Sequence, residues 1–534
     1  MLFYTQKALS KKHSKQGGIR MGIDIEKTTR VTRRNFLKLI GSMSLTGIVT
    51  TVSECEATGG KGWIPGQYGV SGKWPVQVKG RISIDPNNPS IIRDDRKCIL
   101  CGQCLEVCEK VQSVYGYYEL PIKNDITCVG CGQCVLWCPT GAIQERNDIG
   151  KVLQALDDKN MHVVVQTAPA TRVSLGEEFG LLPGSVVEGK QVAALKKIGF
   201  DAVFDTNFSA DLTIMEEATE LIKRMTQKGT GKIPQFTSCC PGWVKFCEYY
   251  YPELIGNLSS VKSPQQLLGV LAKTYYREKQ GLELENVVSV AIMPCTAKKF
   301  ECQRPEMNAA GRKNGNPSIR DVDIVLTTRE LASLMKLKKL DLNQLEDASY
   351  DYLMGEGSGA AVIFGATGGV MEAAVRTAYY LVSKQSPPEE FLNFTAVRGL
   401  AGVKEAEAEI PGVGKVKVAV CHGLKNARIV LDQVRAGNSP WHFIEFMSCL
   451  GGCIGGGGQP RTSLVAADDA RKARSAGLYN LDGKVYHKRA SYKNQEIQDL
   501  YSQYLEYPGS ELAEELLHTH YTDRSGQLTA KKRV

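Results

Sequence analysis

The middle of the chain alternates short aliphatic runs with longer segments of helical spacing. The aliphatic runs are rich in β-branched residues, which is typical of strands buried on both faces. They occupy residues 163–165, 287–292, 322–326, 361–364 and 416–420. Between them, segments such as 212–225 and 265–276 repeat apolar residues at the period of a helix. This pattern predicts a mixed α/β fold with largely parallel sheets.

Three loops with unusual sequences follow predicted strands. They are Thr167-Ala168-Pro169, Met293-Pro294-Cys295 and the glycine-rich segment 365–369. In open α/β sheets, ligands bind beyond the carboxyl ends of the strands. We therefore expect these loops to lie near a binding site.

The C-terminal part of the chain has helical periodicity and two closely spaced histidines. The periodic residues are Ile497, Leu500, Tyr501, Tyr504 and Leu505. His518 and His520 suggest a metal site, but two residues this close would not share one face of a helix. A structural role is the favoured interpretation of both histidines.

Composition and charge describe a soluble globular protein. The 534 residues are 43% hydrophobic and 23% charged, which excludes disorder, collagen and coiled coil as good descriptions. The net charge of +9 is concentrated in residues 1–57, which hold ten Lys or Arg and four Asp or Glu. The remaining chain is nearly balanced, so nothing indicates nucleic-acid binding. The 17 cysteines are too few for a disulfide scaffold but are clustered, as metal sites require.

The N-terminus has the pattern of an export signal. Thr32-Arg33-Arg34-Asn35-Phe36-Leu37-Lys38 precedes a modestly apolar stretch, residues 39–52, and the paired arginines resemble a twin-arginine signal. The alternative is an amphipathic helix with a chance arginine pair. We expect a signal at residues 1–57, a linker at 58–77 and export to the periplasm or the outer face of the membrane. The true start and the cleavage site stay open.

Two cysteine quartets follow the linker. Their spacing is C-x2-C-x2-C-x3-C in both cases, and a proline follows the second. In this pattern three cysteines bind one [4Fe–4S] cluster and the fourth binds the other cluster. One cluster would therefore take Cys98, Cys101, Cys104 and Cys138, and the other Cys128, Cys131, Cys134 and Cys108. Zinc does not explain the doubled pattern, and such close spacing strains disulfides, so residues 78–150 are predicted to form a two-cluster ferredoxin-like α+β domain.

Three further cysteine motifs lie in the α/β region. They are the segments 237–243 (TSCCPGW), 293–301 (MPCTAKKFE) and 445–460 (EFMSCLGGCIGGGGQP). Spacing alone argues for four thiolates converging from separated loops, and the glycines permit close backbone approach. Buried, inert cysteines could explain one motif but not all three. The arrangement suits a bulky inorganic cofactor.

These motifs resemble the signatures of the [FeFe]-hydrogenases, over about residues 80–525. The resemblance implies a two-lobed H-cluster domain at 158–461, a fused small-subunit-like segment at 462–524 and a loose basic tail at 525–534. It also implies an H-cluster, a [4Fe–4S] cubane joined by a cysteine to a two-iron unit bearing CO, cyanide and an azadithiolate. The reaction would be the reversible interconversion of H2 with two protons and two electrons, under anaerobic conditions.

The same resemblance assigns residues to roles. The cubane ligands would be Cys240, Cys295, Cys449 and Cys453, with Cys453 bridging to the two-iron unit. Lys298 would hydrogen-bond a cyanide. The pocket around the cofactor would be lined by Ala168, Pro169, Pro264, Gln265, Met293, Phe364 and Met447. The proton path would run through Cys239, a water, Glu217, Ser259, Glu220 and Arg224, with Glu301 as an alternative branch.

Glu217, Glu220 and Arg224 are spaced at i, i+3 and i+7, so they share one face of a helix. Without the resemblance, a solvated acidic face would be the better interpretation of that spacing. A relay needs titratable or hydroxyl groups at hydrogen-bond steps, which these residue types supply.

We expect an exported hydrogenase that exchanges electrons with a ferredoxin or a c-type cytochrome, in the H2-uptake direction. Maturation proteins and the twin-arginine machinery would be further partners. The alternative is a sensor of H2 or redox state with low turnover. A plain electron carrier would leave the three extra motifs unexplained.

Overall fold

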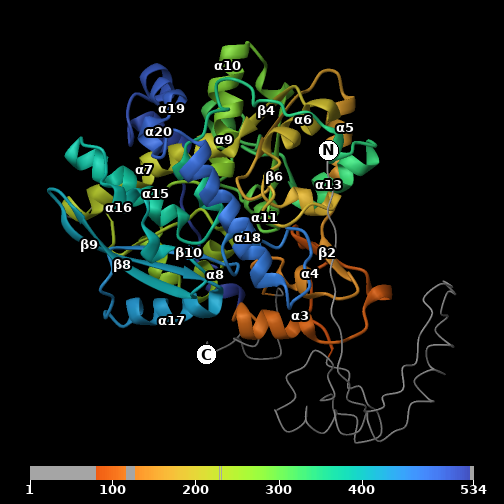
Figure 1. Ribbon diagram of the computed structural model, residues 1–534, viewed down its shortest axis with the longest axis horizontal. Coiled ribbons are helices and arrows are strands. Elements are labelled where there is room, and N and C mark those ends of the chain that lie inside the picture. The colour runs from red at the N-terminus through yellow and green to blue at the C-terminus, as the bar shows by residue number, and fades with distance from the viewer. Residues whose placement is uncertain (1–79, 116–126, 228, 230, 529–534) are drawn as a thin grey trace, which may run out of the picture. The chain divides into compact units, whose positions relative to one another are not determined.

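The computed structural model describes residues 80–115, 127–227, 229 and 231–528. The signal and linker predicted for residues 1–77 lie outside this part of the chain. Within it, the fold is mixed α/β, as predicted, and is built on two four-stranded sheets (Figure 1). No helix of the described residues is both long and apolar enough to cross a membrane.

The first sheet is entirely parallel. Its order is β4 (Ala202–Asp205), β3 (His162–Thr167), β6 (Val287–Met293) and β7 (Ile324–Thr327). Alternate residues of β3 face opposite layers, because side chains alternate along a strand. Val163 and Val165 pack in a cluster with α6 (Glu188–Ile198) and α13 (Thr328–Leu337). Val164 packs in another with α7 (Thr206–Thr226) and α9 (Pro264–Leu271).

The second sheet is parallel except at one edge. Its order is β5 (Gln235–Phe236), β10 (Phe443–Met447), β9 (Gly414–His422) and β8 (Val403–Ile410), and only β8 runs antiparallel to its neighbour. The cluster on one face includes α8 (Pro241–Tyr250) and α17 (Leu424–Arg435). The cluster on the other includes α15 (Gly369–Ser383). The predicted strands at 163–165, 287–292, 322–326 and 416–420 are thus confirmed.

The fifth predicted strand, residues 361–364, is wrong. This run lies in the short helix α14 (Gly359–Val362) and the 3-10 turn Ile363–Gly365. The Ser358 hydroxyl begins the helix by accepting a hydrogen bond from the Ala361 amide. Every residue of the run is buried, so no polar position marks a period, and a short apolar run of this kind does not distinguish a helix from a strand.

The two cysteine quartets form a pair of similar halves. Strands β1 (Ile91–Arg93) and β2 (Ile143–Glu145) pair antiparallel, and the short helices α3 (Gln103–Glu106) and α4 (Gln133–Trp137) each follow a cysteine loop. Gly102 and Gly132 precede these helices with φ of 74° and 69°. The left-handed conformation explains glycine at the matching position of both halves.

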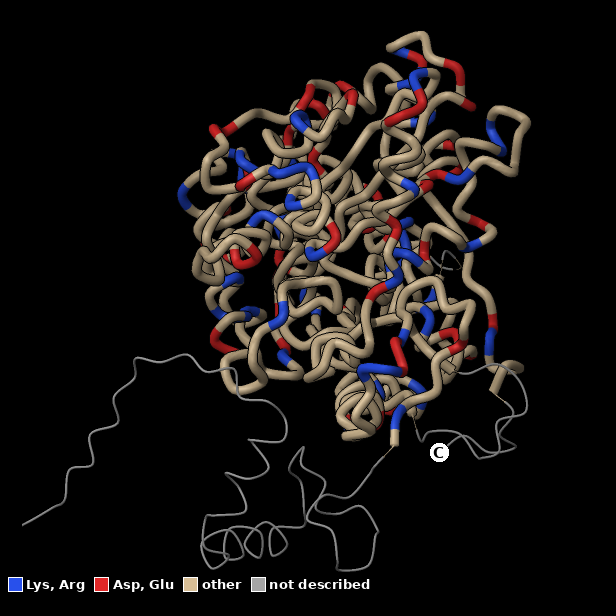
Figure 2. The backbone as a smooth tube through the Cα atoms, turned by 90° about the vertical axis from the view of Figure 1, so that its right-hand side faces the viewer, with Lys and Arg blue, Asp and Glu red and all other residues tan. Residues whose placement is uncertain are grey.

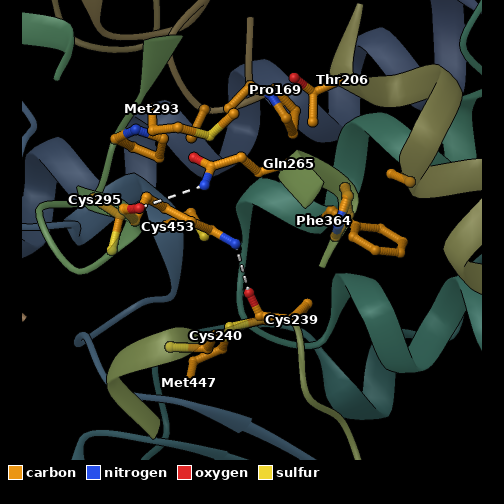
Figure 3. Close-up of a pocket in the computed structure, with 16 residues that line it drawn as sticks. Pro169, Thr206, Cys239, Cys240, Gln265, Met293, Cys295, Phe364, Met447 and Cys453 are labelled. Atoms are coloured by element: carbon orange, nitrogen blue, oxygen red, sulfur yellow. Dashed lines mark hydrogen bonds between the residues drawn. The ribbon is translucent and has the colours of Figure 1, made fainter. Parts of the chain in front are cut away.

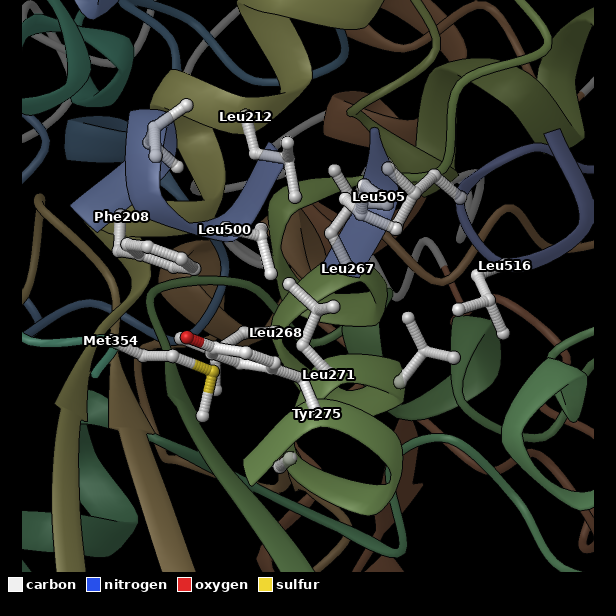
Figure 4. Close-up of a cluster of buried hydrophobic side chains, with 14 of the residues drawn as sticks. Phe208, Leu212, Leu267, Leu268, Leu271, Tyr275, Met354, Leu500, Leu505 and Leu516 are labelled. Atoms are coloured by element: carbon white, nitrogen blue, oxygen red, sulfur yellow. The ribbon is translucent and has the colours of Figure 1, made fainter. Parts of the chain in front are cut away.

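The C-terminal segment packs on helices α7 and α9, beside the first sheet. It contains α18 (Ala467–Asn480), α19 (Gln495–Leu500) and α20 (Glu511–Leu517). The periodicity predicted at 497–505 is confirmed, because α19 continues as a helical turn to Leu505. Figure 4 shows Leu500, Leu505 and Leu516 meeting residues of α7 and α9.

The predicted loose tail is shorter than expected. Ser525–Gln527 forms a 3-10 turn. Leu528 is buried in the cluster that includes α8 and α17. The Gln527 side chain accepts a hydrogen bond from Tyr249. Residues 529–534 lie outside the described part of the chain. Along the described chain, Lys and Arg are interspersed with Asp and Glu (Figure 2).

A buried ion cluster ties the C-terminal segment to α15. Both terminal nitrogens of Arg376 donate to Asp482, at 3.0 and 2.9 Å, and Nη2 also donates to Glu372 at 2.6 Å. These three side chains are at most 1% exposed. Removing one partner of a buried ion pair leaves an uncompensated charge.

We predict that Asp482→Ala lowers the free energy of unfolding by about 3–5 kcal/mol, because it leaves Arg376 with Glu372 alone and removes a partner of Arg489, so that positive charge is in excess in the buried cluster. Asp469 also forms an ion pair, with Lys472, but its side chain is 82% exposed. The control Asp469→Ala should cost no more than about 1 kcal/mol. Urea denaturation followed by tryptophan fluorescence measures both. Equal shifts for the two variants would contradict the assignment.

Candidate functional site

A cysteine-lined cavity lies where strands of both sheets end. The space between its lining residues is about 560 Å³, part of it open to solvent. Figure 3 shows cysteines, apolar side chains and a few polar groups converging on it. Its lining residues are Ala168, Pro169, Ala170, Thr206, Ala210, Cys239, Cys240, Pro264, Gln265, Met293, Pro294, Cys295, Lys298, Phe364, Met447 and Cys453. The predicted pocket residues, from Ala168 to Met447, are therefore all brought to one cavity.

Strand ends carry most of these residues to the cavity. Ala168 follows β3, Cys239 follows β5, Cys295 follows β6 and Cys453 follows β10. Cys240 caps the N-terminus of α8, with Pro241 in the first turn. Parallel strands present their carboxyl ends at the same edge, so residues far apart in sequence meet there.

The fourth predicted cubane ligand lies beside the other three. Cys449 is buried and close to Cys240, Cys295 and Cys453. The turn between Cys449 and Cys453 depends on glycine: Gly452 has φ of 89°, and a Cβ there would collide with the backbone of Thr367.

Within the described residues, no three Cys, His, Asp or Glu side chains lie close enough to bind a single metal ion.

Lys298 brings a positive charge to the cavity. Its Nζ donates to the Cys239 carbonyl at 3.1 Å and to Glu301 Oε2 at 2.9 Å. Burial lowers the pKa of Lys298, but the Glu301 carboxylate outweighs it, so the pKa lies above its usual value. Glu301 also accepts from Ser263 at 2.8 Å. The ammonium is thus held charged in the cavity wall.

The cavity wall has the features that an anionic iron cluster requires. Met293, Phe364 and Met447 are buried and supply apolar surface. Among the described residues, the buried Oε1 of Gln265 has no hydrogen-bond partner, so the cavity offers an unsatisfied polar atom beside its thiols. Thiolates are the protein ligands of iron–sulfur clusters. The residues present therefore fit the H-cluster.

Three of the predicted proton-path residues, Glu217, Glu220 and Arg224, lie on α7. Ser259 Oγ donates to Glu220 Oε2 at 2.6 Å, and Arg224 Nη2 donates to Glu220 Oε1 at 2.6 Å. Glu217 is 2% exposed, and its Oε2 has no partner within the described residues. Burial first, and then the Glu220 charge, raise the pKa of Glu217 to about 8. Burial, with the nearby Glu217 charge, also raises the pKa of the Cys239 thiol.

Three polar residues around these sites, Thr206, Ser260 and Glu216, escaped the sequence analysis, and His518 was noted there only with a structural role. Thr206 lines the cavity, and its position directly after β4 could have indicated this. Ser260, Glu216 and His518 join the hydrogen bonds around Glu220. No local pattern marks them, because His518 comes from a distant segment.

The cysteines predicted to hold the first cluster line a separate cavity. Cys98, Cys101, Cys104 and Cys138 surround it, the grouping predicted for one cluster. In the second predicted group, Cys134 is close to Cys131, Cys128 and Cys108. The second group also lies near the predicted cubane ligands, because Cys131 is close to Cys295 and Cys449.

Glycines allow this approach between the cysteine groups. A Cβ on Gly457 would collide with the Cys131 carbonyl. Hydrogen bonds hold the contact: Thr296 donates to the Gly130 carbonyl at 2.6 Å, and Gln133 donates to the Gly455 carbonyl at 2.9 Å.

Comparisons with known proteins agree on one family. Residues 161–457 match the model described as "Iron only hydrogenase large subunit, C-terminal domain", and residues 468–524 match "Iron hydrogenase small subunit". The chain is 45% identical to the NADP-reducing hydrogenase subunit HndD of Solidesulfovibrio fructosivorans, over 82% of this chain and 75% of that protein. It is 46% identical to the periplasmic [Fe] hydrogenase large subunit of Nitratidesulfovibrio vulgaris, over 74% and 92%.

A solved structure gives the same result. A variant of the [FeFe]-hydrogenase HydA1 from Chlamydomonas reinhardtii is 41% identical, with a TM-score of 0.61, over 70% of this chain and 98% of that chain. The matches cover both the cavity and the C-terminal segment fused to it. The chain belongs to the iron-only hydrogenase family.

Proposed function

We propose that the protein catalyses the reversible interconversion of H2 with two protons and two electrons. The observation that carries the proposal is the convergence of Cys240, Cys295, Cys449 and Cys453 on a largely apolar cavity beside the free thiol of Cys239. When bound, the H-cluster supplies the redox-active iron at which H2 is made or split. Cys240, Cys295, Cys449 and Cys453 would hold it.

The remaining cavity residues have distinct tasks. Lys298 would bind an anionic ligand of the cofactor, because its ammonium is fixed by Glu301. The side chains of Met293, Phe364 and Met447, with Ala168, Pro169 and Pro264, would exclude water. Gln265 would offer its free carbonyl oxygen to the cofactor.

Protons would move through this chain's own groups. Cys239 would exchange a proton with Glu217 through a water, and Glu217 with Ser259, Glu220 and the surroundings of Arg224. The hydrogen bonds from Ser259 and Arg224 to Glu220 support the outer part of this order. The raised pKa of Glu217 supports the inner part, because a relay works best when its pKa lies near the working pH.

Electrons would pass through two [4Fe–4S] clusters in a ferredoxin-like domain at residues 78–150. The cavity lined by Cys98, Cys101, Cys104 and Cys138 supports the first cluster. The proximity of Cys131 to Cys295 and Cys449 supports electron transfer from the second cluster to the H-cluster cubane.

We further propose an exported enzyme that uses a ferredoxin or c-type cytochrome and works in the uptake direction. The Arg33-Arg34 motif supports export by the twin-arginine route, and the relative from Nitratidesulfovibrio vulgaris is named as periplasmic. The proposed organisation is a signal at 1–57, a linker at 58–77, the H-cluster domain at 158–461 and the small-subunit segment at 462–524. Maturation proteins would supply the two-iron unit.

The thiol of Cys239 gives a direct test of the relay. We expect Cys239→Ala to lower turnover by at least about 100-fold, because a positioned acid–base group contributes that much or more. The infrared bands of bound CO and cyanide should remain. The matched control is Cys421→Ala, since Cys421 is buried in β9 away from the cavity. An active Cys239→Ala variant would refute the relay assignment.

The pH dependence should differ between the two directions. Below pH 8 Glu217 is mainly protonated and can donate, and above pH 8 it is mainly a carboxylate and can accept. H2 evolution should therefore fall, and H2 uptake rise, as the pH passes about 8. Glu217→Gln should remove both trends, whereas the exposed Glu405→Gln should keep them. Parallel trends in both directions would count against Glu217.

Cys104→Ala tests the cluster predicted for Cys98, Cys101, Cys104 and Cys138. Loss of one thiolate ligand should remove one [4Fe–4S] signal from the electron paramagnetic resonance spectrum of the reduced protein. It should leave the CO and cyanide bands in place, because Cys104 does not line the main cavity. An unchanged iron content and spectrum would show that this quartet holds no cluster.

A further inference from the structure

Arg224 holds Glu220 at the outer end of the proposed proton path, where the Glu220 side chain is 14% exposed. Its Nη1 donates to the carbonyls of Lys232 and Asn257, both at 3.2 Å. Its Nη2 donates to Glu220 at 2.6 Å and to the Leu258 carbonyl at 2.8 Å. The Arg224 side chain is 6% exposed. A guanidinium does not lose its proton in proteins, so Arg224 can fix Glu220 but cannot pass protons to it.

A second hydrogen-bonded route leaves Glu220 through Ser260. The Ser260 hydroxyl donates to Glu220 Oε1 at 3.1 Å and lies 2.8 Å from Nδ1 of His518. The imidazole of His518 is 9% exposed. Its Nδ1 also lies 3.7 Å from Glu514, whose side chain is 54% exposed. Glu220 is thereby connected to solvent by groups that can carry a proton.

The backbone fixes His518 in this position. α20 ends at Leu517, and His518 continues in an extended conformation that pairs antiparallel with Val261. Two hydrogen bonds flank the pair, from the Thr519 amide to the Ser260 carbonyl at 2.7 Å and from the Lys262 amide to the Leu517 carbonyl at 2.9 Å. The histidine is thus attached to the segment that also carries Ser259.

Buried and exposed carboxylates surround the imidazole. Glu216, from α7, lies 3.3 Å from Nε2 and is itself held by Tyr501 at 2.5 Å and the Gly509 amide at 2.8 Å. Glu220, also from α7, and Glu514, from α20, are the other charged groups that face it. Burial lowers the pKa of His518, but these carboxylates outweigh it, so the pKa lies above its usual value.

We propose that His518, acting through Ser260, exchanges protons between Glu220 and solvent. This inference rests on the proposed hydrogenase function. The imidazolium Nδ1–H passes its proton to Ser260 Oγ while the hydroxyl proton moves to Glu220, leaving a neutral imidazole and a carboxylic acid. Solvent beside Glu514 reprotonates His518, and uptake of H2 reverses each transfer. The fused small-subunit segment thereby contributes a relay group as well as packing.

The test compares His518→Gln with the matched control His520→Gln in the anaerobically purified holoenzyme. His520 is exposed and stands two residues further on. H518Q should lower H2 evolution by roughly tenfold or more, leave the CO and cyanide bands unchanged and regain activity with added imidazole. H520Q should behave as the natural protein. Loss of activity with no imidazole rescue, or an H518Q variant with an unchanged rate, would overturn the proposal.

Two further variants keep the test decisive if H518Q does not fold. Ser260→Ala keeps the imidazole but breaks the bridge, so it should lower the rate without rescue by imidazole. Glu216→Gln removes a carboxylate that raises the pKa of His518. The part of the pH–rate profile that depends on the histidine should therefore shift to lower pH. The titration midpoint of the His518 resonance in ¹³C-histidine spectra should shift in the same direction. An unchanged rate in S260A, or an unshifted pH–rate profile and titration midpoint in E216Q, would refute the relay.

The outcomes also separate this proposal from the proposed function. If the natural protein lacks turnover or the CO and cyanide bands, the hydrogenase assignment itself fails. If the natural protein is active and His518→Gln leaves the rate of H2 evolution unchanged, only the His518 relay fails.

Discussion

Under the proposed function, exclusion of water from the cysteine-lined cavity is the constraint on which the rest of the structure depends. A site that makes or splits H2 must keep charged intermediates away from solvent, because the low local dielectric strengthens every interaction within it. The same exclusion prevents protons from arriving by diffusion. The buried Glu217, the thiol of Cys239 and the charged Lys298 would follow from this one requirement. Each provides an acid–base or charged group at a place that bulk water would not reach.

The parallel sheets make such a cavity possible. Strands β3, β5, β6 and β10 end near it, so loops separated by up to about 280 residues contribute to one wall. The packing around α7 then connects the cavity to the surface, because one face of that helix carries Glu217 and Glu220. The C-terminal segment covers α7 and α9, and its ordered end supplies Tyr521, whose hydroxyl donates to the Ser259 carbonyl at 2.6 Å. Packing of this segment and the proposed proton route are therefore parts of one arrangement.

Much of this could be predicted from the sequence, for physical reasons that differ between features. Cysteine spacing is a direct consequence of cluster geometry, so the grouping of Cys98, Cys101, Cys104 and Cys138 followed from the motif. Strands β3, β6 and β7 of the first sheet followed from their β-branched runs, whereas β4 was not predicted. The structure of residues 361–364 could not be predicted in this way. All four residues are buried, so the run shows no helical or strand period, and the hydrogen bond to the Ser358 cap favours a helix. The pocket residues came from the family motifs, while the contact between Ser260 and His518 depends on tertiary packing that no local pattern records.

The most direct test of the account is H2 evolution from reduced viologen by anaerobically purified protein supplied with the two-iron unit, with infrared spectra of the same sample. The account predicts fast turnover together with bands of bound CO and cyanide. Bands without turnover would contradict the catalytic assignment and favour a sensor. Absence of both the bands and the turnover would contradict the H-cluster assignment.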